Sequence, residues 1–332
     1  MTVHQAVAIP DSEYVRLETI LTNSIVPPAP LKQRFRALFT LKSVKSNRAV
    51  DIIARGFADP SVLLRHELAY VLGQMKNPHA IPILNNVLAT LSEDPMVRHE
   101  AAEALGAIGQ ESSLEILEKY RTLEQESSRV VRETVELAIE RIQYELTKAK
   151  TPPGNTDCDN NGGYTSIDPA PALEFAAKTE SDVAHIKAMS TKEVGAVLMD
   201  VSLPLFQRYK AMFALRNRGD KEAVLELAKG FADDSALFRH EIAYVFGQMQ
   251  HEASVPSLIT TLENETEDTM VRHEAAEALG SIATPECFAV LEKYKGEGVP
   301  QVVKESCLIG LDMAEFEVSG EFQYAEKIET VV

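Results

Sequence analysis

The eleven residues MVRHEAAEALG occur twice in this chain, at 96–106 and at 270–280, without a single change. Ala, Leu, Met and Glu favour helix, and the apolar residues of this stretch recur at the spacing of one helical face. A related phrase, RHELAYVLGQM, runs from 65 to 75 and returns as RHEIAYVFGQM at 239–249. The sequence therefore predicts recurring helices that each carry an adjacent His and Glu.

The two halves of the chain repeat each other at a constant offset of 174 residues, which takes His66 to His240 and His99 to His273. Within each half, a basic residue precedes an apolar helix every 31 to 34 residues. These basic residues are Arg34, Arg65, Arg98, Arg132, Arg208, Arg239, Arg272 and Lys304. Periods of this length are typical of solenoids, because one helical hairpin cannot bury its apolar face alone. We expect an all-α solenoid of eight hairpins, four in each half.

The segment TPPGNTDCDNNGGYTSIDPAPA, residues 151–172, separates the two copies. It is rich in Pro, Gly, Asn and Asp and has no apolar periodicity, which is typical of a flexible linker. We therefore predict a first half of residues 1–150 and a second half of residues 173–332.

The amino-acid composition limits the classes of function and the cellular compartment that fit this chain. The chain contains 33 Lys and Arg but 50 Asp and Glu, which gives a formal net charge of −17. This charge disfavours binding to nucleic acid and favours binding to cationic partners. No apolar stretch is long enough for a membrane span, and no secretory leader opens the chain. The three cysteines match neither a disulfide framework nor a zinc motif. We expect a cytoplasmic protein with reduced cysteines.

The outer repeats provide an internal control for the His-Glu pairs. There, the two residues after the basic one are Phe35-Arg36, Glu133-Thr134, Tyr209-Lys210 and Glu305-Ser306. The fold thus tolerates aromatic, basic or acidic side chains at these positions, so packing does not require His-Glu. One such pair would be read as solvated surface. Four pairs in register are instead interpreted as a site.

Equivalent residues on stacked helices lie side by side, with helix axes about 8 to 10 Å apart, so two histidines can reach one ion. His66 and His99 would share an ion in the first half, and His240 and His273 in the second. Each half also offers two carboxylates. Two His with one carboxylate is the ligand set of non-haem Fe(II) oxygen chemistry. Spacing leaves open which Glu ligates and which binds a cationic amine.

Several neighbouring residues receive structural interpretations. Tyr70 and Tyr244 are expected to pack as ordinary half-buried tyrosines, and Glu103 and Glu277 to lie on a solvated helix face. A further pair of carboxylates, at 94 and 268, stands four residues before an Arg and is expected to pair with it.

On these residues the chain resembles the deoxyhypusine hydroxylases, monooxygenases built from HEAT-like repeats, over nearly its whole length. The four His-Glu motifs, their register and the flanking GQM and AAEALG phrases carry the resemblance. It implies hydroxylation of deoxyhypusine on a eukaryotic translation factor, completing hypusine, by a monomeric enzyme with two Fe²⁺ ions, O₂ and an external reductant. No catalytic residue is implied beyond the di-iron centre.

The resemblance also assigns the motif residues. The implied iron ligands are His66, His99 and Glu100 in the first half and His240, His273 and Glu274 in the second. Glu67 and Glu241 are left to bind the substrate amines.

Three other functions fit parts of the pattern. A HEAT scaffold that only binds partners would hold no stoichiometric metal. A chromophore lyase built from HEAT-like repeats would bind a tetrapyrrole and has no need of four His-Glu pairs. A binuclear hydrolase would use the same ligands for zinc or manganese without oxygen.

Overall fold

The fold was analysed in a computed structural model that describes residues 9–122, 124–150, 163–173, 184, 186 and 188–319. Over these residues the chain forms helices and no strands, and a shorter helix alternates with a longer one. The all-α solenoid is confirmed, whereas the number of eight hairpins stays a prediction. None of the described helices combines the length and apolar character needed to cross a bilayer.

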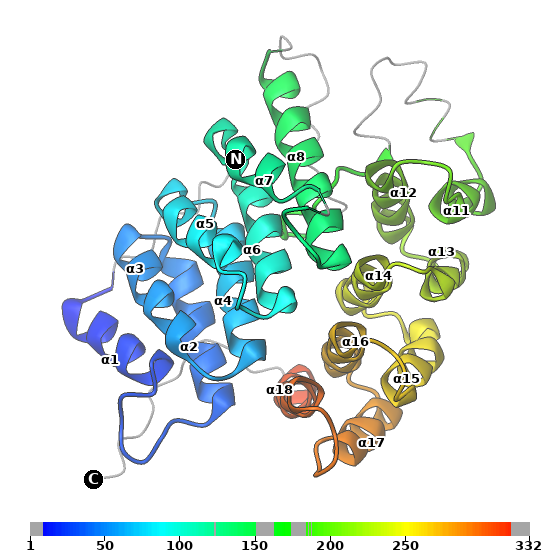
Figure 1. Ribbon diagram of the computed structural model, residues 1–332. Coiled ribbons are helices and arrows are strands. Elements are labelled where there is room, and N and C mark those ends of the chain that lie inside the picture. The colour runs from blue at the N-terminus through cyan, green and yellow to red at the C-terminus, as the bar shows by residue number, and fades with distance from the viewer. Residues whose placement is uncertain are drawn as a thin grey trace.

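The longer helices form an inner layer and the shorter ones lie outside it (Figure 1). The inner helices are α2 (Leu31–Val44), α4 (Val62–Met75), α6 (Pro95–Ile108), α8 (Arg129–Lys150), α12 (Leu205–Arg218), α14 (Ala236–Met249), α16 (Thr269–Ile282) and α18 (Gln301–Ser319). The outer helices are α1 (Asp11–Leu21), α3 (Asn47–Arg55), α5 (Ile81–Ala89), α7 (Leu114–Lys119), α11 (Thr191–Met199), α13 (Lys221–Ala228), α15 (Val255–Glu263) and α17 (Pro285–Tyr294). Short 3-10 turns cover Gly56–Ala58, Pro78–Ala80, Glu111–Ser113, Lys229–Ala232 and Glu252–Ser254.

The inner helices close into a ring. Within each half, consecutive inner helices pack against one another, and the halves meet where α18 contacts α2 and where α8 contacts α12. The helices α4 and α6 of the first half therefore face α14 and α16 of the second across the centre (Figure 1). The His-Glu motifs lie on these four helices.

The glycine of each GQM phrase allows two neighbouring inner helices to touch. A Cβ added to Gly73 would lie 2.7 Å from Ala104 Cα on α6. The equivalent Cβ on Gly247 would lie 3.3 Å from Ala278 Cα on α16. This close approach brings the two motif histidines of each half together, since they lie about one and a half to two helical turns earlier on the same helices.

Asp94 and Asp268 do not pair with the following arginines as expected. Each carboxylate instead caps its helix, accepting a hydrogen bond of 2.9 Å from the backbone N–H of Met96 or Met270. Arg98 is buried, donates to the Leu88 carbonyl and pairs with Glu126 at 2.5 Å. The carboxylate at the helix start accepts from a backbone N–H that has no partner within the helix. This contact stabilises the helix more than a solvated ion pair with the arginine would.

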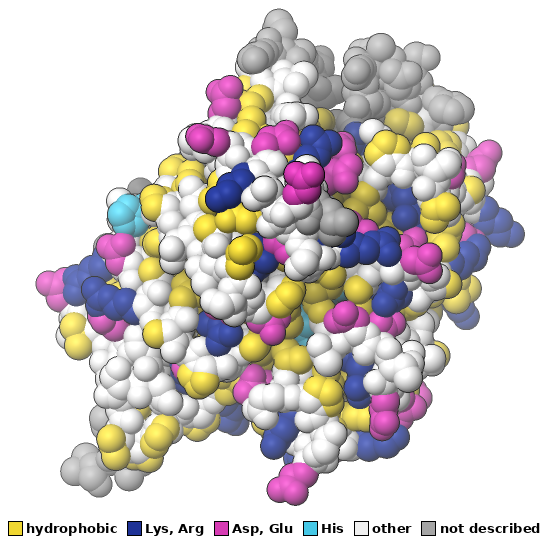
Figure 2. All heavy atoms as spheres, viewed as in Figure 1, with side chains coloured by type: hydrophobic (Ala, Val, Ile, Leu, Met, Phe, Trp, Pro, Cys, Tyr) yellow, Lys and Arg dark blue, Asp and Glu magenta, His cyan; other side chains and the backbone are white. Residues whose placement is uncertain are grey.

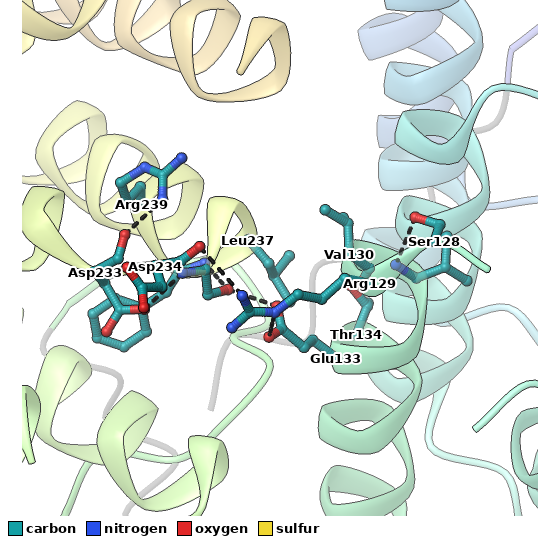
Figure 3. Close-up of polar contacts among 12 residues, drawn as sticks. Ser128, Arg129, Val130, Glu133, Thr134, Asp233, Asp234, Leu237 and Arg239 are labelled. Carbon is teal, nitrogen blue, oxygen red and sulfur yellow. Dashed lines mark hydrogen bonds and ion pairs between the residues drawn. The ribbon is translucent and has the colours of Figure 1, made fainter. Parts of the chain in front are cut away.

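Two equivalent hydrogen bonds join the halves. The Ser235 hydroxyl, which caps α14, donates to Glu133 Oε2 on α8 at 2.6 Å; Glu133 is labelled in Figure 3. The Ser61 hydroxyl, which caps α4, donates to Glu305 Oε2 on α18 at 2.7 Å. Each half thus holds the first turn of a motif-bearing helix of the other half. Figure 3 also shows Arg129 beside Glu133, an ion pair of 2.7 Å.

Part of the predicted linker lies outside the described residues, namely 151–162. The described part, 163–172, packs against both halves, and its Asp168 and Ala170 are buried. The domain boundaries and the flexibility of the linker as a whole stay predictions. Over the face in view, acidic and basic side chains lie interspersed (Figure 2).

Candidate metal centre

The four motif histidines meet at the centre of the ring, where the two halves face each other. They come from α4, α6, α14 and α16, and each of these residues is at most 5% exposed. The ring centroids of His66 and His99 lie 5.4 Å apart, and those of His240 and His273 5.3 Å apart. Across the halves, the centroids of His66 and His273 are 5.1 Å apart. Residues separated by up to 207 positions in the sequence thus form one cluster.

Both ring nitrogens of each of these histidines are buried without a hydrogen-bond partner. An unpaired buried polar atom costs about 1–3 kcal/mol, so four such imidazoles together are a large penalty. Ligation of a metal ion removes that penalty, because a neutral imidazole nitrogen is a good ligand for Fe and Zn.

The protonation of the cluster also suits ligation. Burial and the positive charge of His66 lower the pKa of His99 and His273 well below the ordinary value, and lower that of His240 to about 4. Burial lowers the pKa of His66 too, but the nearby Glu100 carboxylate outweighs it and raises the pKa to about 9. Three of the four imidazoles are therefore neutral at pH 7, which is the form that binds metal.

Carboxylates complete the cluster. Glu100 lies 3.3 Å from His66 Nε2, and Glu274 lies 3.4 Å from His240 Nε2. In the first half, one donor atom each from His66, His99 and Glu100 lie within 4.8 Å of one another, as the expected ligand set requires.

In the second half, the three expected ligands do not form one compact set of donor atoms as they do in the first half. The compact sets of the second half are His273 with Glu274 and Glu277, and His240 with His273 and His66 of the other half. The donor atoms of both halves thus form one continuous group rather than two isolated sites.

Glu103 and Glu277 do not lie on a solvated face, contrary to the expectation. Both line the central cavity, and Glu277 Oε1 is 3.5 Å from His273 Nδ1. Burial raises the pKa of both carboxyls. Glu103 and Glu277 each follow a motif Glu by three residues, and residues at that spacing lie on the same side of a helix. This spacing was the one signal in the sequence that placed them near the site.

The cavity beside the histidines has a volume of about 310 Å³ and is lined by residues of both halves. Tyr70 and Tyr244 line it, and their hydroxyl oxygens are hydrogen-bonded to each other at 3.1 Å across the halves. The expectation of ordinary packing missed this contact, because it depends on how the two halves meet. Glu67 and Glu241 line the same cavity.

Negative charge accumulates in this cavity. Burial and the Glu277 charge raise the pKa of Glu67 to about 8, and burial with neighbouring carboxylates raises the pKa of Glu241 and Glu274 well above the ordinary value. Carboxylates crowded in a low-dielectric site either take up protons or require cations. Together with the unpaired imidazoles, this arrangement fits divalent metal ions and a cationic ligand.

Comparisons with known proteins point in the same direction. The HEAT repeats family profile matches residues 49–140 and 224–312, and the PBS lyase HEAT-like repeat profile matches residues 207–233. Deoxyhypusine hydroxylase of Mus musculus is 49% identical over 94% of this chain and 96% of its own length. That of Candida albicans is 50% identical over 89% and 90%. The structure of human deoxyhypusine hydroxylase in complex with glycerol superposes with a TM-score of 0.78 at 44% identity, covering 92% of this chain and 97% of the human one.

Proposed function

This chain belongs to the deoxyhypusine hydroxylase family, and from that premise we propose that it hydroxylates the deoxyhypusine side chain of a translation factor, completing hypusine. The observation that carries the proposal is the cluster of four buried imidazoles with unpaired nitrogens beside a cavity rich in carboxylates. Neither a partner-binding scaffold nor a solvated surface requires such a cluster.

We propose that two iron ions bind here, one held by His66, His99 and Glu100 and the other by His240, His273 and Glu274. When bound, iron would supply the activation of O₂, with electrons from an external reductant. The protein's own part is to hold neutral imidazoles in a water-poor centre and to place the substrate beside them.

The remaining motif carboxylates, Glu67 and Glu241, are proposed to bind the substrate amines. Both line the cavity beside the histidines, and both are buried where an unpaired negative charge is costly. An alkylammonium group would neutralise that charge through charge-assisted hydrogen bonds. We further propose a monomeric enzyme of the cytoplasm that acts on a protein substrate and not on nucleic acid.

The first experiment is the metal content of the purified protein after anaerobic reconstitution with Fe²⁺. We expect about two irons per chain, and a loss of iron in His99→Ala and His273→Ala. Glu67→Gln should retain the iron and lose binding of the substrate protein. Hydroxylation of a deoxyhypusine-bearing protein is assayed in parallel.

The alternatives give different results in the same experiment. A binuclear hydrolase would retain zinc or manganese and work without oxygen. A partner-binding scaffold would hold no stoichiometric metal. Loss of iron in Glu67→Gln would contradict the division between ligating and substrate-binding carboxylates.

A further inference from the structure

The duplication predicts two equivalent ends for the central cavity, one in each half, but the linker occurs only once. Its described residues 164–168, here called the strap, border the cavity and contact both halves. Tyr164, Thr165 and Ser166 of the strap line the cavity together with Glu241 and Gln248. The internal symmetry of the fold is therefore broken at the substrate site.

Buried polar contacts hold the strap to the second half. Arg216 is fully buried, and its two terminal nitrogens each lie 2.8 Å from a carboxylate oxygen of Asp168. The same guanidinium stacks against the Tyr164 ring, 4.3 Å from its centroid. A bidentate pair of this kind fixes both the distance and the orientation of the strap.

The strap is also tied to both halves by the glutamines of the two GQM phrases. Gln74 accepts a hydrogen bond from the Ile167 N–H at 2.9 Å and donates one to its carbonyl at 3.3 Å. Gln248 donates to the Ser166 hydroxyl at 2.7 Å. These contacts make the strap a fixed wall across the seam between the halves.

Another part of the cavity, formed without the strap residues, opens into a second cavity. There, Phe39 of α2 and Met313 of α18 line both the central cavity and an adjoining one of about 120 Å³. The adjoining cavity reaches Lys32 and Arg36, whose side chains are 49% and 40% exposed. None of the described strap residues lines it. Glu67 lies in this part, since it lines both cavities, whereas Glu241 lines only the central one.

We propose that the strap is the blind end of the substrate cavity, and that the alkylammonium chain enters between α2 and α18 and ends against Tyr164 and Ser166. This inference rests on the proposed function and deepens it. The chain passes Glu67 near the entrance and reaches Glu241 beside the strap, so two amines at a fixed separation are recognised in order. The strap is thereby a specificity device that sets the length of chain accepted.

Blocking each end separately tests the route of entry. Met313→Cys and Thr165→Cys are made in a Cys158→Ser background and labelled with a bulky maleimide; Cys287 and Cys307 are buried. Binding of 1,7-diaminoheptane and of 1,3-diaminopropane is then measured by calorimetry before and after labelling, with each unlabelled protein as its own baseline.

We expect the label at Met313→Cys to block the entrance and so to weaken the binding of both 1,7-diaminoheptane and the shorter 1,3-diaminopropane at least tenfold. The label at Thr165→Cys occupies the blind end, so it should weaken the binding of 1,7-diaminoheptane but change that of 1,3-diaminopropane less than about twofold. A strap label that weakens the binding of 1,3-diaminopropane as strongly as the entrance label does, or more strongly, overturns the proposal. Hydroxylation of the protein substrate by the unlabelled wild type is assayed separately. Its absence would refute the proposed function, whereas the diamine result would still decide which end is open.

A series of α,ω-diaminoalkanes of increasing length tests the strap as the end wall. The affinity of the wild type should rise with length and then fall once the chain meets the strap. Tyr164→Ala should shift the preferred length upward. Tyr144→Ala is the matched control, since Tyr144 is also half-buried and stacked on an arginine, at 5.9 Å from Arg141, but does not line the cavity. An unchanged length preference in Tyr164→Ala would refute the role of the strap.

Discussion

Replacing Asp168 by Asn should loosen the strap without changing its shape. The Asp168 side chain is 1% exposed and the Arg216 side chain 0%, so the substitution leaves a buried guanidinium without its counter-charge. Removing one partner of a buried ion pair costs about 3–5 kcal/mol. Gln248 Oε1, at 2.8 Å from Arg216, and the Tyr164 ring remain as partners, which places the expected cost near the lower end, at about 3 kcal/mol.

This cost should appear as local opening, because the strap can detach while the helices stay folded. At 1.4 kcal/mol per factor of ten, a loss of about 3 kcal/mol raises the population of the detached strap by about 100-fold. The Ile167 amide, which donates to Gln74, reports on this opening. Its hydrogen exchange should therefore accelerate by about 100-fold in Asp168→Asn.

The control is Asp233→Asn, which breaks the equally buried pair between Arg208 and Asp233 at 2.5 Å, away from the strap. That variant should lower the melting temperature but leave the local opening of the strap, and therefore the exchange rate of the Ile167 amide, unchanged. If Ile167 exchanges at the wild-type rate in Asp168→Asn, within a factor of about three, the ion pair does not hold the strap and the reasoning fails.

Three further predictions concern the scaffold. Gly73→Ala should destabilise the protein by about 1–3 kcal/mol and Gly247→Ala by less, because the added Cβ would lie 2.7 Å from a neighbouring Cα in the first case and 3.3 Å in the second; equal melting temperatures of the two variants would contradict this order. Glu305→Ala removes the acceptor of the Ser61 hydroxyl and should lower the free energy of unfolding by about 1 kcal/mol, an effect that a Ser61→Ala, Glu305→Ala double-mutant cycle should show to be non-additive. Burial raises the pKa of the Cys307 thiol to about 12, so the folded protein keeps the proton while the unfolded chain loses it above its ordinary pKa. The free energy of unfolding should therefore fall as the pH rises above about 9. Cys307→Ala should make this fall with pH less steep.

The repeat architecture and the motif histidines could be predicted because both depend on local sequence. A 31- to 34-residue period predicts stacked hairpins, and four His-Glu pairs in register predict one face of neighbouring helices. The repeat period does not predict how the two halves of the ring pack against each other. The hydrogen bond between Tyr70 and Tyr244 and the mixed donor set of His66, His240 and His273 depend on that docking.

Other contacts escaped prediction because polar residues were interpreted by composition alone. Asp168 lies in a segment whose Pro, Gly and Asn content is typical of a linker, yet its carboxylate meets Arg216, 48 residues away, in the protein interior. Glu277 follows its motif by three residues on an alanine-rich helix, yet its carboxylate lines the central cavity and accepts a hydrogen bond of 3.1 Å from the Ser306 hydroxyl of α18. Contacts between residues that are far apart in the sequence produce no periodic pattern that a single sequence could show.

The closed ring of inner helices has a consequence for how this architecture evolves. An open solenoid gains or loses repeats at its ends, where capping units shield the exposed core. Here α18 contacts α2, so within the described residues the first and last repeats shield each other instead of ending in separate caps. One additional hairpin would separate these two helices and move the imidazoles of opposite halves out of reach of one another. The geometry of the central cluster therefore depends on the number of repeats in the array.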